Sequence, residues 1–474
     1  MMKALSKSAD VIGERRRMLD AAPASRKAPM REAILAGPLL STLGRLAMPT
    51  IAVLVAQTLV GVIETWYVSR LGTDALVGVS VVFPVWVLMT MMSAGGIGGG
   101  VASAVARAIG SARDDEADDL VLHAAVIAVA LGATFSVAMW LGGSTFYTAL
   151  GATGGALAQA LRYSNWIFLC AVPIWVVNLF SAALRGAGNV GTPARISFAG
   201  IIVLAPLSPL TIFELGPVPG MGIAGAGIAV TIFYTGAALY MLRLLRRGGA
   251  GLKLVVRPLQ LRLFRDTLGV GVISSVSVIQ LNLAVVIVTG LVGHFGTAAI
   301  AGYELAARLE YLFVPVLFGL GSSVLMMVGT CTGAGQVARA KGIATLGTLL
   351  GVAFTTLIGV MMLVSPSLWL RIFTADPAAL AEGATYLRLV AFAYPPLAAA
   401  FLLGFVSQGT RRPGWTTFAG TVKLLLAAGG GWVVVERLSA GLPALAATVV
   451  ASQLAAAAVC LWAAATGRIW PRMT

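Results

Sequence analysis

Long apolar runs, separated by short polar, glycine or proline breaks, make up most of the chain. A run of about 20 apolar residues is long enough to cross the hydrocarbon core of a bilayer as one helix. Twelve runs can be distinguished, at residues 46–68, 76–106, 120–142, 160–184, 193–213, 221–245, 266–292, 298–328, 341–364, 384–408, 414–436 and 443–466. The pattern predicts an all-α polytopic membrane protein with twelve transmembrane helices.

The composition agrees with this prediction. Of the 474 residues, 58% are hydrophobic and 11% are charged, whereas about a quarter of residues are charged in a typical soluble domain. This balance disfavours a cytosolic enzyme, an ordinary nucleic-acid-binding protein and a disordered scaffold. The sequence contains no phosphate-binding loop of the G-x-x-x-x-G-K-[ST] type, so it does not encode an ATP-driven pump. We expect no cofactor and a proton or sodium ion gradient as the energy source.

The positive charges are distributed unevenly. Counted against the twelve runs, 26 of the 33 Lys and Arg residues fall in the N-terminal segment, the loops after even-numbered runs and the C-terminus. Basic loops stay in the cytoplasm, so we expect a bacterial inner-membrane protein with both termini inside. Residues 1–45 are predicted to be a basic, largely disordered cytoplasmic tail, and residues 467–474 a cytoplasmic C-terminus. Basic flanks of this kind do not require a nucleic-acid partner.

An internal repeat divides the chain. Residues 71–78 (LGTDALVG) recur as residues 295–302 (FGTAAIAG), and at almost the same offset Tyr163 meets Tyr386 and Gly186 meets Gly409. The chain is therefore interpreted as a duplicated six-helix unit.

Because each unit has an even number of spans, both enter the membrane in the same direction, as parallel repeats related by an axis along the membrane normal. We expect an N-terminal lobe at 46–245, a cytoplasmic linker at 246–265 and a C-terminal lobe at 266–466. Two such lobes around a central cleft, rocking about the linker, are typical of an alternating-access transporter.

Several short segments resemble the multidrug and toxic compound extrusion (MATE) family. They are Leu46-Ala47-Met48-Pro49, Gln57-Thr58-Leu59, residues 66–72, residues 106–113, residues 184–189, Ala307-Arg308-Leu309-Glu310 and Gly333-Ala334-Gly335. The resemblance covers nearly everything from about residue 40 onward. It implies an inner-membrane antiporter that exports cationic or amphipathic compounds in exchange for protons or sodium ions.

Three acidic residues lie clearly within predicted spans: Glu64, Glu304 and Glu310. An ionised carboxylate in hydrocarbon is costly unless it is protonated, paired or hydrated, so intramembrane acids are candidate functional residues. Glu64 is the leading candidate for the proton or cation site. In the prokaryotic subgroup that the chain most resembles, the matching first-helix position carries an aspartate proposed as the cation site. The alternative is that Glu64 lies in headgroup water near Arg70.

The same resemblance places polar side chains on the fifth helix, where this chain has Ile201 and Ala205. A sodium site needs several oxygen ligands, so their loss favours protons. On the fourth span, Tyr163, Asn178 and Ser181 match or approximate polar positions of the family's N-terminal lobe and are further candidates for the cation or proton site. For Asn178 and Ser181, an interhelical hydrogen bond is the favoured interpretation.

On the eighth span, Glu304 and Arg308 are spaced i, i+4, which predicts a structural ion pair on one helix face. Glu310 points to another face and is the second candidate for a proton or substrate-cation site. The alternative for Glu310 is a salt bridge to Arg308 or to a loop arginine.

Aromatic and methionine side chains of the first two spans are candidates for the substrate-binding surface, because they suit organic cations and varied shapes. We expect Phe83, Trp86, Met89 and Met92 to line it, whereas Trp66 and Tyr67 are more typical of interfacial anchors.

The sequence therefore predicts a proton-coupled exporter of organic cations, drugs or amphipathic metabolites, acting as a monomer with small-molecule substrate and membrane lipid as its partners. Two alternatives remain: a lipid-linked precursor flippase of the same superfamily, and a membrane scaffold without transport of its own.

Overall fold

The computed structural model describes residues 28–214 and 219–471, and within these ranges the regular structure is entirely helical. Eleven helical segments are long and apolar enough to span a membrane. A twelfth span is formed by α7 (Gly154–Leu169) and α8 (Ala171–Gly186), which meet at an angle of 47°. The predicted fold class and its twelve spans are confirmed.

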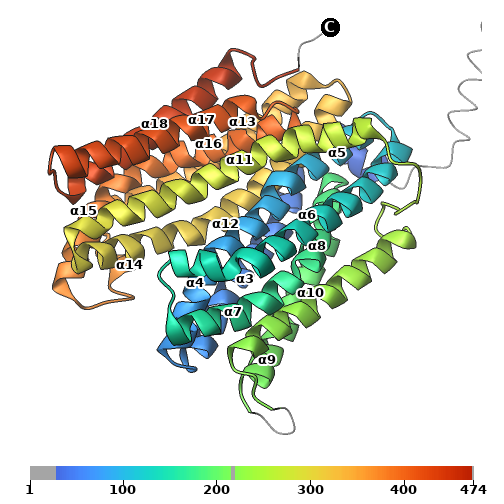
Figure 1. Ribbon diagram of the computed structural model, residues 1–474. Helices are drawn as coiled ribbons and strands as arrows, with labels where there is room; N and C mark the ends of the chain where they lie inside the picture. The colour runs from blue at the N-terminus through green and yellow to red at the C-terminus, as the bar shows by residue number, and fades with distance from the viewer. Residues whose placement is uncertain (1–27, 215–218, 472–474) are drawn as a thin grey trace, which may run out of the picture.

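The first six spans form the N-terminal lobe, drawn in blue to green in Figure 1. Its further elements are α3 (Leu39–Ser69), α4 (Thr73–Met91), η1 (Met92–Gly96), α5 (Ile97–Gly110), α6 (Asp114–Ala149), α9 (Gly191–Ile212) and α10 (Ile223–Arg246). The segments α4, η1 and α5 make one continuous span. A single turn of π-helix, η1, therefore interrupts the second span at its glycine-rich part.

The second six spans form the C-terminal lobe, drawn in yellow to red. Its elements are α11 (Leu261–Val292), η2 (Gly293–Phe295), α12 (Thr297–Gly333), α13 (Val337–Val364), α14 (Ser367–Leu370), α15 (Pro377–Val390), η3 (Ala391–Ala393), α16 (Tyr394–Gly409), α17 (Gly414–Leu425), η4 (Leu426–Gly430), η5 (Val433–Arg437) and α18 (Leu442–Ala465). In Figure 1 the lobes lie against each other near α5 and diverge toward the opposite end.

The sequence repeat is visible in the packing. A Cβ atom on Gly78 of α4 would lie 2.8 Å from the backbone nitrogen of Ala160 on α7. A Cβ on Gly302 of α12 would lie 2.8 Å from the Cα of Gly383 on α15. These glycines match in the repeat, so each lobe brings its second and fourth spans together by the same close backbone contact.

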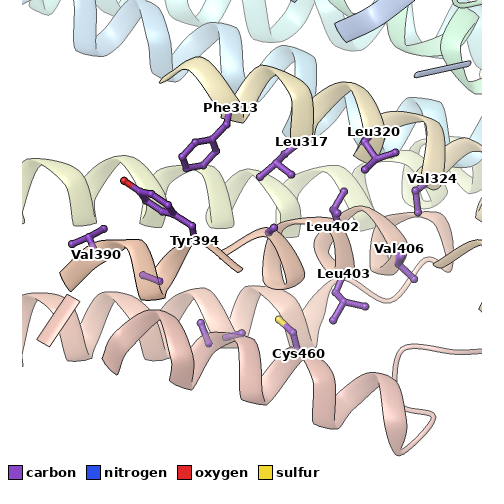
Figure 2. Packing of buried hydrophobic residues seen from close by; sticks show 14 of the residues in the cluster. Phe313, Leu317, Leu320, Val324, Val390, Tyr394, Leu402, Leu403, Val406 and Cys460 are labelled. Carbon is purple, nitrogen blue, oxygen red and sulfur yellow. The ribbon is translucent and has the colours of Figure 1, made fainter. Parts of the chain in front are cut away.

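Each lobe has its own apolar core. In the C-terminal lobe, Phe313, Leu317 and Val324 of α12 face buried residues of α15, α16 and α18, including Tyr394 and Cys460 (Figure 2). The three cysteines are buried and free, one in the N-terminal lobe and two in the C-terminal lobe.

The predicted N-terminal tail is helical where the structure describes it. Residues 1–27 lie outside the described residues, but Ala28–Ala36 forms helix α2 and α3 begins at Leu39. Ile34 and Leu43 are buried in the core of the C-terminal lobe. The prediction of a largely disordered segment missed this because the apolar residues of α2 are too few to stand out as a span.

The linker, residues 247–260, is attached to the N-terminal lobe. The backbone N–H of Lys253 donates to Asp118 Oδ1 at 3.1 Å, and the N–H of Gln260 donates to Nε2 of His123 at 2.9 Å. Arg257 forms salt bridges to Asp115 and Asp119, both at 3.2 Å. These carboxylates raise the pKa of Arg257, the hydrogen bond to Asp115 contributing most.

Candidate coupling and substrate site

Glu64 lies on the half of α3 that is distant from the N-terminal segment. Its Oε1 atom is buried and has no hydrogen-bond partner among the described residues. Two tyrosines from other helices, Tyr163 of α7 and Tyr234 of α10, lie within electrostatic range of the carboxyl group. The structure brings together Glu64 and Tyr163, as expected, and adds Tyr234, which is not among the residues predicted from the sequence.

Another tyrosine follows Glu64 on the same helix. One turn along α3, the Tyr67 hydroxyl donates to the backbone carbonyl of Ala205 on α9 at 3.4 Å. This contact holds the first and fifth spans together at the position where the related subgroup has polar side chains. An ionised carboxylate without a donor is costly in a low-dielectric site, so the arrangement suits a carboxyl group that binds a proton or a cation.

Asn178 and Ser181 of α8 differ from Tyr163 in their contacts. The Asn178 amide donates to Ser93 Oγ of η1 at 2.7 Å, and Ser181 is buried in the N-terminal lobe. In the described part of the chain, no hydrogen bond or ion pair joins either residue to Glu64, and the hydrogen bond of Asn178 joins two spans. The structural interpretation therefore holds for Asn178.

Glu310 of α12 lies among polar residues of the C-terminal lobe. Lys423 of α17 acts electrostatically on its carboxyl group, and so do the hydroxyl-bearing rings of Tyr386 and Tyr394. No ion pair within 4.0 Å joins Glu310 to a basic group in the part of the chain that the structure describes. Figure 2 shows the Tyr394 ring beside Phe313, with ring centroids 5.0 Å apart.

The charged neighbour of Glu310 is thus Lys423, and not Arg308 or a loop arginine as the alternative interpretation supposed. Lys423 is one of two basic residues inside predicted spans, and this position in the sequence could have indicated that it has an acidic or hydrated neighbour. A lysine within a span needs a counter-charge or water, but the sequence alone does not say which carboxylate supplies it.

The predicted ion pair between Glu304 and Arg308 is not formed. Both side chains are exposed, and the guanidinium of Arg308 lies 5.5 Å from the ring centroid of Phe373. An exposed pair on one helix gains little over solvated charges, so contact with an aromatic face is a competitive alternative.

The four predicted substrate-binding residues differ in how far the structure buries them. Met89 is fully buried in the core of the N-terminal lobe and cannot contact a ligand, which corrects its assignment. Trp86 and Met92 are partly buried against the same core, and Phe83 is 56% exposed. The helical period places Met89 on the core-facing side of the span. Met91 instead faces the other lobe, where the Asn282 amide lies 3.8 Å from its sulfur atom.

The lobes are joined by a charged network at the end where the basic loops gather. Asp266 of α11 lies 2.9 Å from Arg107 of α5 and 2.7 Å from Arg411, which follows α16. Arg107 also donates to Ser103, whose hydroxyl donates to the carbonyl of Gln408 on α16. We refer to Arg107, Asp266 and Arg411 as the inter-lobe triad.

Helix α2 forms a further connection between the two lobes. Arg31 donates to the carbonyl of Gly110 in the N-terminal lobe at 3.2 Å. From the C-terminal lobe, Arg339 donates to the carbonyl of Ile34 at 2.7 Å and to that of Gly37. The short helix therefore bridges the two lobes.

Close backbone contacts between α5 of the N-terminal lobe and α11 and α12 of the C-terminal lobe also join the two lobes. A Cβ atom on Gly100 of α5 would lie 3.0 Å from the Cα of Gly271 on α11, and one on Gly110 would lie 3.0 Å from the Cα of Thr330 on α12. The glycines of the second span are packing residues, as small residues are in other membrane helix interfaces.

Comparison with known proteins agrees with the resemblance seen in the sequence. The MatE family model matches twice, at residues 49–210 and 274–433, once in each lobe. An FAD transporter of Shewanella oneidensis is 25% identical over 391 residues, which cover 81% of this chain and 85% of that protein. A probable multidrug resistance protein NorM of Thermotoga maritima is 24% identical, over 70% of this chain and 72% of that protein.

Solved structures share the fold. A MOP superfamily transporter from Pyrococcus furiosus superposes with a TM-score of 0.85 at 22% identity, covering 92% of this chain and 97% of that one. An outward-facing multidrug resistance MATE family transporter gives a TM-score of 0.84 at 21% identity, with the same coverage. Because the family model covers most of both lobes, the chain is a multi-pass membrane protein that belongs to the MatE family of efflux transporters, whose members are transporters and not enzymes.

Proposed function

We propose that this chain is a secondary active antiporter of the inner membrane that exports organic cations or amphipathic compounds in exchange for protons. Glu64 is the coupling carboxyl group in this proposal. The observation that carries it is the buried Oε1 atom, which has no hydrogen-bond donor among the described residues. A carboxyl group in this position alternates between a protonated form and a form that needs a cation or water nearby.

The composition of the site supports protons over sodium ions. A sodium ion needs several oxygen ligands arranged around it. Ile201 and Ala205 supply no side-chain oxygen, and the carbonyl of Ala205 already accepts a hydrogen bond from Tyr67. One carboxyl group is sufficient to bind a proton.

The inter-lobe triad supports an assignment of the closed side. We infer that this end is cytoplasmic, because basic residues gather there, and that the structure represents a state closed to the cytoplasm. Transport then requires the triad to break as the lobes rock. Proton and substrate compete because each biases the same equilibrium between the two states.

A second substrate class is favoured by one specific observation. Lys423 places a positive charge within the C-terminal lobe without a salt bridge in the described residues. A relative is an FAD transporter, and a dinucleotide carries phosphate groups that a lysine can neutralise. An anionic amphipathic metabolite is therefore the alternative to an organic cation.

Transport in proteoliposomes tests the proposal. Protein reconstituted with ethidium as the organic cation should move it when a pH gradient is imposed, and should not respond to a sodium gradient at constant pH. FAD transport is measured in the same vesicles. The Lys423→Gln variant should impair transport of this anion and leave ethidium transport unchanged. A scaffold would move neither compound, and a sodium-driven response would refute the proton assignment.

A further inference from the structure

A charged cavity of about 500 Å³ lies at the end of the C-terminal lobe that we infer to be cytoplasmic, and neither Glu64 nor Glu310 lines it. It is lined by Arg412, Trp415, Thr466, Gly467 and Arg468. Arg412 comes from the turn before α17, and the last three residues follow α18. Nothing in the transport mechanism uses these residues.

Two arginine side chains line this cavity. Arg468 lies 4.3 Å from the ring centroid of Trp462 and 4.9 Å from that of Trp415, and these two indoles are 5.2 Å apart. Arg412 donates to the carbonyl of Arg468 at 3.5 Å. The tryptophans therefore fix the position of one guanidinium, and the second is bound to the backbone carbonyl of the same residue.

Neither arginine has a carboxylate partner within 4.0 Å among the described residues. By contrast, Arg411 and Arg107 share Asp266, and Arg257 and Arg262 bind acids of α6. Two guanidinium groups that line one cavity without a carboxylate partner there attract an anion. Phosphate is one of the anions whose geometry the arginine guanidinium matches.

The cavity opens beside an apolar surface. Phe418 of α17 and Leu461 of α18 are half-exposed, and the rings of Phe418 and Trp415 are 6.0 Å apart. Tryptophan is typical of the boundary between hydrocarbon and headgroups. A ligand that fits this arrangement has a phosphate group next to a hydrocarbon chain.

We infer that this cavity binds the headgroup of an anionic phospholipid. The phosphate lies between Arg412 and Arg468, the indoles of Trp415 and Trp462 lie at headgroup depth, and an acyl chain follows Phe418 and Leu461. Basic pockets between helices on the cytoplasmic side commonly recognise such headgroups. The inference is independent of the transported substrate and of the coupling ion.

Lipid retention tests it. Purified protein is equilibrated with phosphatidylglycerol or phosphatidylcholine, and bound lipid is counted by native mass spectrometry. The test variant is Arg412→Gln with Arg468→Gln. The matched control is Arg246→Gln with Arg247→Gln, which removes two exposed arginines at the end of α10, outside the cavity.

Phosphatidylglycerol should be retained in preference to phosphatidylcholine. Its affinity should fall about fivefold for each cavity arginine removed, the loss expected for one basic group at an anionic headgroup. The control should retain it like the parent protein, and a variant with Lys at both cavity positions should keep most of the binding.

Three results would overturn the inference: equal retention of the two lipids by the parent protein, equal losses in test and control variants, or complete displacement of the lipid by inorganic phosphate. The last would assign the cavity to a soluble anion. The comparison of lipids on the parent protein needs no variant, so poor folding of the glutamine variant leaves the inference testable.

Discussion

Arg107 and Asp266 form a salt bridge across the two lobes, in which one guanidinium nitrogen lies 2.9 Å from both carboxylate oxygens. Their side chains are only 13% and 16% exposed, whereas Arg411, which binds the same carboxylate, is 57% exposed. A largely buried contact and a largely hydrated one therefore share a single acid, and mutation can separate them.

Substitution of Asp266 should destabilise the folded protein strongly. Asp266→Asn leaves Arg107 buried without its counter-charge, and removal of one partner of a buried pair costs about 3–5 kcal/mol. Arg411→Gln removes only an exposed contact, worth about 1 kcal/mol or less. Thermal unfolding of the purified variants measures both. Equal losses would mean that the buried contact stabilises the protein no more than a surface one.

Glu64→Gln should uncouple transport without preventing substrate binding. The amide resembles the protonated acid in shape but cannot release a proton. We expect loss of uptake driven by a pH gradient in proteoliposomes, with ethidium binding retained. Glu304→Gln is the matched control, because Glu304 is an exposed acid on another span. Full pH-driven transport by Glu64→Gln would exclude this carboxyl group from coupling.

Glu310 and Lys423 should behave as an energetically coupled pair. Lys423→Met removes the positive charge that acts on Glu310, and Glu310→Gln removes the charge that acts on Lys423. Neighbouring groups of this kind show interaction energies of about 0.5–3 kcal/mol in a double-mutant cycle. Unfolding free energies of the two single variants and the double variant give this value. In the control cycle, Glu304→Gln combined with Lys423→Met should be additive.

Gly302→Ala should destabilise the C-terminal lobe. The added methyl group would lie 2.8 Å from the Cα of Gly383, and overpacking of this kind costs about 1–3 kcal/mol. Gly236→Ala on α10 is the control, since no heavy atom lies within 4 Å of the new methyl group. Unfolding of both variants is compared in the same detergent. An unchanged Gly302→Ala would show that α12 and α15 can move apart at no cost.

Hydropathy and the repeat predicted the architecture because both are properties of long segments. Each span needs about 20 apolar residues, and a duplicated unit leaves matching tyrosines and glycines. The equivalence of Tyr163 and Tyr386 is an example. Each lies near an acid of its own lobe, but those acids, Glu64 and Glu310, come from α3 and α12, which are not matching spans.

Individual contacts were less predictable. The i, i+4 spacing of Glu304 and Arg308 permits an ion pair, but whether it forms depends on the position of Phe373, more than sixty residues further along. The nearness of Lys423 to Glu310 is likewise a consequence of how α12 and α17 pack. Periodicity identifies the face of a helix and carries no information about the neighbour opposite that face.

The attachment of the linker to α6 determines where the molecule can bend. Because Lys253, Arg257 and Gln260 are bound to acids and a histidine of the first lobe, residues 253–260 move with that lobe as one rigid body. Arg262, in the first turn of α11, is bound to Glu116 of the same lobe as well, so the proposed rotation of the lobes has to be absorbed further along α11. The salt bridge of Asp266, which would oppose that rotation, is thus carried by the same helix that connects the two lobes.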